Sequence, residues 1–593
     1  MKSFKIPFRV ILSTFASLSV NSAKNLKNKI FDVQLDSSLL PTSRDSFRMT
    51  NRTNLISLKE IPISLWIVLA VGFIVRIIFS VSLEYSIIHG ISSDDSYYYF
   101  RIAQNIANGY GSTFDQLTLT NGYQPLVMLP LIIIYSLFSS TEILLPVIFG
   151  QIILTIINLL AAILTYHLML RLSNKSKLAA VMTVTFLYLN PVFIAINFKS
   201  LETNLYWFFL VLALLYFLNN RENNSNRNDF IFGILISLAA LSRLDGAFLI
   251  IAFALYVLFK KSFSLSERVK KIFFAGFGFS LIFVPYLIYN QIVFGHFVPI
   301  SGRAKVFHNH KMVLNEVGSY FSFDFVLYEL KRFFFPFNFD LFLHRGFGLV
   351  EQIFVVVGLI FLAVIIIYLF KSKLLHQLLS RFKGLGFLFL FLLFQYSFYT
   401  LYFWEYRFYY FLPEIITAAL FFGLIVDELN NKWIRNRTNI KPIWNRFSIS
   451  VMILLIAAYI FAARQIFTAQ HEQTLVYKSS QWIKENIPSE KILGSANTGI
   501  LSYFTQMRFV NLDGMVNNDE LLTAFRHGEN GYLNYLKKYK IEYLCDYFLK
   551  PFPENKYNFP KILNDKYSVM HVVTDANLKY QLLNHMLIIK LEL

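Results

Sequence analysis

The chain has 593 residues, 55% of them hydrophobic and 15% charged, with a mean hydropathy of +0.49 and a formal net charge of +19. So few charges cannot cover the apolar surface of a soluble protein of this size, so the composition excludes a soluble fold and predicts a polytopic α-helical membrane protein. Most basic residues lie in short segments between apolar runs, which is typical of cytoplasmic loops and argues against a nucleic-acid partner. The single cysteine, Cys545, excludes an intrachain disulfide and any cysteine-cluster metal site.

The first segment, residues 1–60, is basic and polar. Its weak apolar patch at 10–20 contains Ser and Thr and has Arg9 at its edge, so it makes a poor spanning helix. We predict a mostly disordered cytoplasmic tail, with either Met1 or Met49 as the true start.

Repeated apolar runs predict about eleven membrane-spanning helices. The first lies at residues 61–81. The others are expected at 143–170, 178–196, 204–218, 230–241, 246–259, 272–289, 349–370, 385–403, 411–426 and 449–463. A shorter apolar piece at 126–138 contains Pro130, and we expect it to form an interfacial helix in the first outer loop rather than a span.

The basic loops agree on one orientation. With a cytoplasmic N-terminus, all of them fall on the cytoplasmic side, at 171–177, 220–228, 260–271, 371–373 and 430–446. This agreement requires that 126–138 does not cross the membrane. The first loop and everything after about residue 463 then lie outside.

The first outer loop, "ISSDDSYYYFRIAQNIANGYGSTFDQLTLTNGYQPL", places Asp94 and Asp95 side by side at the edge of a span. An apolar stripe from Tyr99 to Ile106 predicts an amphipathic helix that starts at these acids. One acid would be an ordinary helix cap, and capping remains an alternative to a catalytic role. Two acids at this position favour function.

Other ionisable residues gather on the same outer face. They are Lys199, Glu202, Arg243, Asp245, His296, Arg303, Lys305, Glu405 and Arg407. Charges near membrane depth are energetically unfavourable, so their collection on one face predicts a site. Structural alternatives remain open: Glu202 could simply begin a helix, and Arg243 could pair with Asp245 at a hairpin tip.

A family resemblance follows from these residues. A carboxylate, an aromatic residue two positions on and an arginine six positions on, here Asp95, Tyr97 and Arg101, resemble the first outer loop of GT-C integral-membrane glycosyltransferases. The pieces "SLETNLY", "SRLDGAFL", "VPYLIYNQIVFGHFVPISGRAK" and "SANTGILSYFTQMRFVNLDGMVNND" follow in the order of a bacterial subset of that superfamily. The chain departs from the usual pattern at Leu244 and Val127.

The resemblance implies an enzyme that moves a sugar from a polyprenyl-phosphate donor to an acceptor hydroxyl, with inversion. The acceptor is a glycan, a lipid or a protein. The resemblance also favours a bacterial inner (plasma) membrane, with membrane lipids as neighbours.

Asp95 is the predicted general base, because a carboxylate within reach of a hydroxyl can take its proton. Asp94 would support it or, together with Asp95 and Glu202, hold a divalent cation such as Mg or Mn.

Positive side chains would stabilise the leaving phosphate, for which the arginine fork is well suited. The predicted substrate-binding residues are Tyr97, Arg101, Glu202, Arg243, Asp245, Arg303, Lys305 and Arg407. Among them, Glu202 and Asp245 would orient sugar hydroxyls or the base.

Three parts are therefore predicted: a tail at 1–60, a transmembrane domain at 61–463 and an extracytoplasmic domain at 464–593. In the last part, strand patterns at "KILGSA", "RFVNLDG" and "IEYLCDYF" alternate with helical patterns, which indicates a small α/β fold. Two rival functions stay open, a multi-span transporter and a non-catalytic scaffold for envelope glycan assembly. A transporter would favour internal repeats, which the sequence does not display.

Overall fold

A computed structural model describes residues 61–223, 225–334, 374–435, 471–547, 563, 566–574 and 585–592. Leu55–Leu593 forms one compact unit. The predicted tail at 1–60 and the expected spans at 349–370 and 449–463 lie outside the described residues.

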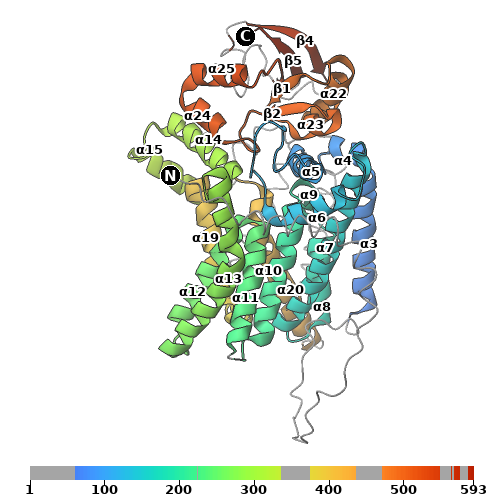
Figure 1. The fold of residues 1–593 in the computed structure, drawn as a ribbon. Coiled ribbons are helices and arrows are strands. Elements are labelled where there is room, and N and C mark those ends of the chain that lie inside the picture. Colours follow the sequence, from blue (N-terminus) through green and yellow to red (C-terminus); the bar gives the residue numbers. More distant parts are fainter. Residues whose placement is uncertain are drawn as a thin grey trace, which may run out of the picture. The chain divides into compact units, whose positions relative to one another are not determined.

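The helical part contains the following elements. They are α3 (Ile63–Val81), α4 (Leu83–Ile88), α5 (Asp94–Ala107), α6 (Pro125–Tyr135), α7 (Leu144–Leu172), α8 (Lys177–Tyr188), α9 (Pro191–Lys199), α10 (Glu202–Asn220), α11 (Asn226–Ser242), η3 (Leu244–Ala247), α12 (Phe248–Phe259), α13 (Leu265–Phe294), α14 (Ile300–Val317), α15 (Phe323–Phe334), α18 (Leu374–Arg381), η4 (Lys383–Leu385), α19 (Gly386–Phe398), η5 (Tyr399–Phe403), η6 (Phe408–Phe411) and α20 (Leu412–Arg435). Figure 1 shows the long helices running side by side.

Six described helices are long and apolar enough to cross a membrane. They are Ile63–Val81, Leu144–Leu172, Glu202–Asn220, Leu265–Phe294, Gly386–Phe403 and Phe408–Glu428. Helices α8 and α9 make a seventh if they form one span bent by 55° at Asn190–Pro191. The proline cannot continue the helix, and the Asn190 side chain caps the new one by accepting the N–H groups of Val192 and Phe193.

The expectation of about eleven spans is not confirmed. Helix α11, expected to span, has only 17 residues, and the expected span at 246–259 belongs to the short apolar helix Leu244–Phe259. Helix α6, at 126–138 in the prediction, is also short, with 11 residues. A straight helix needs about 20 residues to cross the hydrocarbon core.

The bundle is held together by close helix contacts as well as by apolar side chains. A Cβ atom added at Gly233 of α11 would collide with the Ala275 carbonyl of α13, and one added at Gly278 of α13 would collide with Phe230. Backbones therefore approach directly, as small residues permit in membrane helices. Inside the bundle, the Trp207 indole N–H donates to the Thr165 hydroxyl (3.1 Å), which satisfies a buried polar group.

Helices α4, α5, α6 and α9 lie at the end of the bundle that faces the C-terminal domain (Figure 1). The amphipathic helix predicted after the paired acids is present as α5. Neither acid is its N-cap residue, which is Ser93, and both stand in its first turn. Tyr97 and Phe100 on α5 are fully buried, so this helix joins the bundle to the domain above it.

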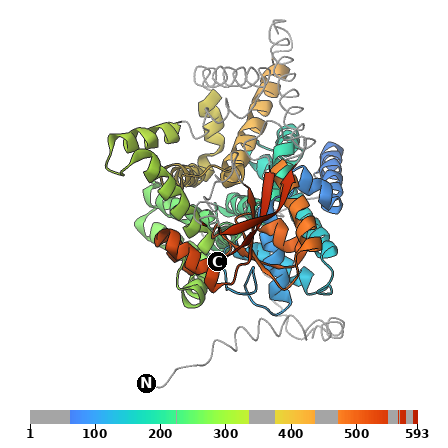
Figure 2. The same ribbon diagram turned by 90° about the horizontal axis from the view of Figure 1, so that it is seen from above.

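The C-terminal domain has a five-stranded sheet in the order β2-β1-β3-β5-β4. Its elements are α22 (His471–Asn486), β1 (Ile492–Ser495), α23 (Gly499–Thr505), β2 (Arg508–Asn511), α24 (Asp519–Arg526), α25 (Gly528–Lys538), β3 (Tyr543–Tyr547), β4 (Tyr567–Thr574) and β5 (His585–Leu591). Strand β1 is parallel to β2 and β3, whereas β5 is antiparallel to β3 and β4. The predicted small α/β domain is confirmed, and Figure 2 shows its sheet from above.

Candidate functional site

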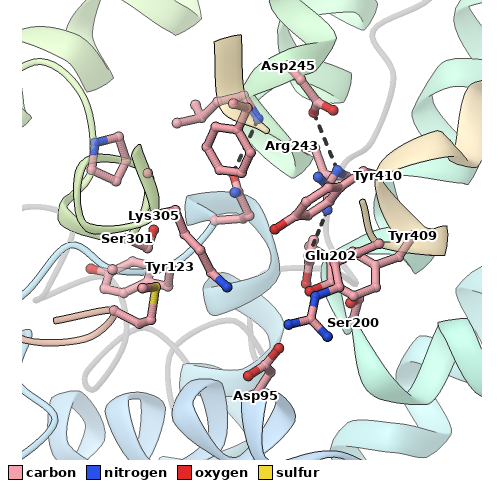
Figure 3. Close-up of a pocket in the computed structure, with 18 of the residues that line it drawn as sticks. Asp95, Tyr123, Ser200, Glu202, Arg243, Asp245, Ser301, Lys305, Tyr409 and Tyr410 are labelled. Atoms are coloured by element: carbon pink, nitrogen blue, oxygen red, sulfur yellow. Dashed lines mark hydrogen bonds and ion pairs between the residues drawn. The ribbon is translucent and has the colours of Figure 1, made fainter. Parts of the chain in front are cut away.

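A pocket of about 460 Å³ lies between the C-terminal domain and the helix ends nearest to it. Its walls come from α5, from the starts of α10, α12 and α14, from η5 and η6, and from the loops after β1 and β2. Charged side chains that line it are Asp95, Lys199, Glu202, Arg243, Asp245, Lys305, Arg407 and Asp513. Figure 3 labels Asp95, Glu202, Arg243, Asp245 and Lys305. Most of the ionisable residues that the sequence analysis named therefore line one pocket.

Asp95 stands in the first turn of α5, and its exposed side chain borders the pocket. In Figure 3 the Asp95 carboxylate and the Lys305 side chain both point into the pocket. Within the described ranges this carboxylate accepts no hydrogen bond and forms no ion pair. A carboxyl group in this condition is available to a ligand.

The neighbouring Asp94 points elsewhere. It is buried, and its carboxylate accepts the backbone N–H groups of Gly499 (3.1 Å) and Ile500 (2.8 Å), at the start of α23. Burial raises the pKa of Asp94 to about 7, against the effect of these two hydrogen bonds. Asp94 thus ties α5 to the C-terminal domain, which corrects its expected place beside the substrate.

The close approach at this point requires glycine. A Cβ atom at residue 499 would collide with the backbone and carboxyl group of Asp94. Gly499 therefore lets the loop after β1 come near enough for both N–H groups to reach the carboxylate.

Tyr97 and Arg101 also belong to this contact between α5 and α23 and do not line the pocket. Tyr97 packs against Tyr503 and Phe504, with ring centroids 5.4 and 5.2 Å away. Arg101 is buried and donates to Gln506 Oε1 (2.7 Å). Both side chains connect two parts of the chain, which corrects their expected place in the pocket.

Within the pocket, Arg243 lies between two carboxylates (Figure 3). Its guanidinium is 3.0 Å from Glu202 and 3.4 Å from Asp245, and all three side chains are buried. The Tyr399 hydroxyl donates to Asp245 (2.8 Å) and accepts from Arg243 (3.0 Å). The pairing of Arg243 with Asp245, which the sequence left as an alternative, is present, and the group holds two acids for one cation.

In a second charged group, two cations share one acid. Lys305 lies 2.8 Å and Arg407 2.9 Å from the same oxygen of Glu405. Although burial acts in the opposite direction, the two cations lower the pKa of Glu405 below its usual value. Both cations line the pocket, and so does Lys199 at the end of α9. This edge has a surplus of positive charge that an anionic ligand would neutralise.

Arg303 does not line this pocket. It pairs with Asp519 of α24, which His296 also contacts (2.6 Å), and it lines two adjoining hollows of about 870 and 370 Å³. The sequence assigned the Arg303 guanidinium to the leaving phosphate. In the structure this guanidinium forms an ion pair with Asp519 of the C-terminal domain instead.

Among the pocket residues that the sequence did not predict are Asn497 after β1 and Asp513 after β2. Burial raises the pKa of Asp513 to about 6, and the nearby Lys305 acts to lower it. Ligands of α/β domains bind outside the carboxyl ends of parallel strands, so the strand patterns "KILGSA" and "RFVNLDG" contained a usable signal.

The expected set for Mg or Mn does not fit the observed geometry. Among the described residues, no group of three or more His, Cys, Asp or Glu side chains could hold a metal ion. The reason is local: Asp94 turns toward the C-terminal domain, and Glu202 pairs with Arg243. We assign no step to a cation at these three residues.

Family models match two parts of the chain. Residues 124–289 match the model described as dolichyl-phosphate-mannose-protein mannosyltransferase. This match confirms the predicted resemblance. The chain resembles the GT-C glycosyltransferases. The matched segment contains Glu202, Arg243 and Asp245 of the pocket. Residues 463–584 match a domain of unknown function, and no curated protein matches the chain.

Solved structures of an oligosaccharyltransferase from Archaeoglobus fulgidus are similar in part. The apo form is 16% identical, with a TM-score of 0.48 over 81% of this chain and 69% of that one. The complex of that archaeal enzyme, AglB, with an inhibitory peptide and a dolichol-phosphate is 16% identical, with a TM-score of 0.40 over 80% and 69%. A complex with zinc and sulfate is 17% identical, with a TM-score of 0.42 over 80% and 68%.

Proposed function

We propose that this chain is an inverting membrane glycosyltransferase that moves a sugar from a polyprenyl phosphate to an acceptor hydroxyl, with Asp95 as general base. One observation carries the proposal. A carboxylate without a protein partner among the described residues and an edge with surplus cations, Lys305 and Arg407 around Glu405, border the same pocket.

The chemistry needs these two features. Asp95 takes the proton of the acceptor hydroxyl while that oxygen attacks the anomeric carbon. The bond between the anomeric carbon and the phosphate oxygen breaks, and the phosphate leaves with the bonding electrons. Lys199, Lys305 and Arg407 would stabilise its growing negative charge, which is most effective in a partly enclosed site.

The pocket also offers an apolar wall for the prenyl chain. Phe248 and Ile251 of α12 and Phe398 of α19 line it, next to the charged residues. A lipid phosphate could keep its chain along this wall while its head reaches the cations. Glu202 and Asp245 would orient sugar hydroxyls beside Arg243.

The same proposal includes the domain boundaries at 61–463 and 464–593, a cytoplasmic N-terminus and a bacterial inner membrane. The positions of the basic loops support this orientation. A transporter or a scaffold would not require an acid without a partner that faces a cationic edge.

The test uses the full-length chain in nanodiscs with a panel of labelled polyprenyl-phosphate sugars, beginning with dolichyl-phosphate mannose, and a membrane extract as acceptor. Release of polyprenyl phosphate and transfer of label are measured. We expect Asp95→Asn to lower transfer by about 10²- to 10⁴-fold, because it removes the base. Asp324→Asn, an exposed acid on α15 away from the pocket, is the control.

Undiminished transfer by the Asp95→Asn variant, at unchanged thermal stability, would contradict the proposed base. Movement of a solute across the membrane without release of polyprenyl phosphate would favour a transporter. Wild-type chain that does neither would favour the scaffold.

A further inference from the structure

The C-terminal sheet contributes two side chains to the pocket from equivalent positions. Strands β1 and β2 are parallel, with Ser495 opposite Asn511 at their ends. Asn497 and Asp513 each stand two residues beyond these ends, and both line the pocket. The carboxyl ends of two parallel strands therefore meet the cavity at one edge, the place where α/β domains bind ligands.

Hydrogen bonds hold both residues in place. The Asn497 amide donates to Asp546 of β3 (3.1 Å), which also accepts the Ala496 N–H (2.8 Å). The amide oxygen of Asn497 makes no hydrogen bond with the described residues. Asp513 accepts the Met515 N–H (2.9 Å), and the ring of His308 contacts its backbone oxygen (2.9 Å).

Asp94 fixes this loop relative to the proposed base. Its carboxylate holds the N–H groups of Gly499 and Ile500, two and three residues after Asn497, while Asp95 next to it faces the pocket. A ligand on Asn497 and Asp513 would therefore lie at a set position relative to Asp95. This gives the paired acids separate roles, one in the pocket and one in its alignment.

The chemistry of this wall selects a class of ligand. An amide oxygen and a carboxylate accept hydrogen bonds, and Lys305 donates them. The rings of Tyr98 and Tyr123, which line the same pocket, offer flat apolar faces. Adjacent hydroxyl groups on a sugar ring supply two donors to two acceptors, whereas an acidic or purely apolar acceptor would leave the carboxylate unpaired.

We propose that Asn497 and Asp513 form an acceptor subsite for neighbouring hydroxyl groups of a sugar, so that the acceptor is a glycan. The inference rests on the proposed function. It gives a role to the domain matched at 463–584, whose function is unknown: that domain selects the acceptor, while the helical part holds the donor.

The test compares Asp513→Asn and Asn497→Ala with Glu529→Gln, an exposed acid on α25 away from the pocket. With dolichyl-phosphate mannose and a membrane extract, label is separated into free sugar, glycan, lipid and protein. We expect transfer to glycan to fall about tenfold or more in the first two variants. Hydrolysis of the donor to free sugar should change by less than about twofold, because the donor does not contact these residues.

A second measurement does not depend on turnover. Nanodiscs that contain the full-length chain are applied to arrays of immobilised glycans and of Ser- and Thr-containing peptides. Binding to glycans that is lost in Asp513→Asn and kept in Glu529→Gln supports the subsite. Binding to peptides alone, or glycan binding that Asp513→Asn leaves intact, overturns it, and an equal fall of transfer and hydrolysis would assign Asp513 to the donor instead. Wild-type chain that binds glycans but releases no polyprenyl phosphate would contradict the proposed enzyme and leave the glycan site standing.

Discussion

Two charged groups at the pocket differ in their balance of acids and cations. Glu202, Arg243 and Asp245 hold two acids for one cation, and their side chains are at most 7% exposed. Lys305, Glu405 and Arg407 hold two cations for one acid, and the Arg407 side chain is 54% exposed. In the first group, both carboxylates pair with Arg243, so its positive charge is neutralised. In the second group, one carboxylate pairs with two cations, so one positive charge is left over. The difference suggests that the first group mainly shapes the site and that the second binds the anion.

The largest expected effect tests the buried group. Arg243→Gln leaves two buried carboxylates without their cation, so we expect a loss of about 3–5 kcal/mol in the free energy of unfolding. Thermal unfolding of the purified chain in detergent measures it. The matched change Arg407→Gln, at an exposed cation, should lower stability by less than about 1 kcal/mol. If both variants lost the same free energy of unfolding, the two groups would not differ in their contribution to stability, and the comparison would fail.

The next effect tests the cationic edge. Arg407→Gln should reduce donor turnover by about 10- to 100-fold, since it removes a charge-assisted contact to the leaving phosphate. Arg303→Gln is the matched control, because the guanidinium of Arg303 pairs with Asp519 outside the pocket. We expect its donor turnover to stay within about threefold of wild type. A stronger effect at Arg303 than at Arg407 would move the phosphate site to the adjoining hollow.

The smallest effect concerns the two neighbouring acids. The pKa of Asp94 is raised from 3.8 to about 7, so the folded chain holds a proton here that the unfolded chain releases between these values. The contribution of Asp94 to stability is therefore fully present below about pH 4 and is lost as the pH rises toward 7. In Asp94→Asn this part of the pH dependence should disappear. Unfolding midpoints at pH 5 and pH 8 measure it, and an unchanged pH slope would count against the buried carboxyl.

Sequence reasoning reached the helices that have strong local signals. Long apolar runs predicted the six candidate spans, and the stripe from Tyr99 to Ile106 predicted α5, because burial of a helix face leaves a periodic pattern. The alternation of strands and helices predicted β1, β2 and β3. Strands β4 and β5 were not predicted, because β4 is mostly unburied and β5 is buried almost throughout, so neither has the alternating pattern of a half-buried strand.

Only part of the site could be predicted from the sequence, because its geometry depends on long-range contacts. Nothing local distinguishes Asp94 from Asp95, and only the approach of Gly499 decides that one faces the sheet domain and the other the pocket. Arg303 resembles Lys305 in sequence, yet Asp519, more than two hundred residues later, pairs with it. Asp513 stands in a domain without a known catalytic motif, so only strand topology places it in the pocket with the charged residues of the helical part.

The most direct measurement is an electron cryomicroscopy structure of the full-length chain with a non-transferable phosphonate analogue of a polyprenyl-phosphate sugar. The account predicts that the phosphonate lies within hydrogen-bond distance of Lys305 and Arg407. The anomeric carbon should be open toward Asp95, and the prenyl chain should lie along Phe248 and Ile251. A phosphonate bound at Arg303, or a sugar with Asp95 on the side of the leaving group, would contradict the central claim.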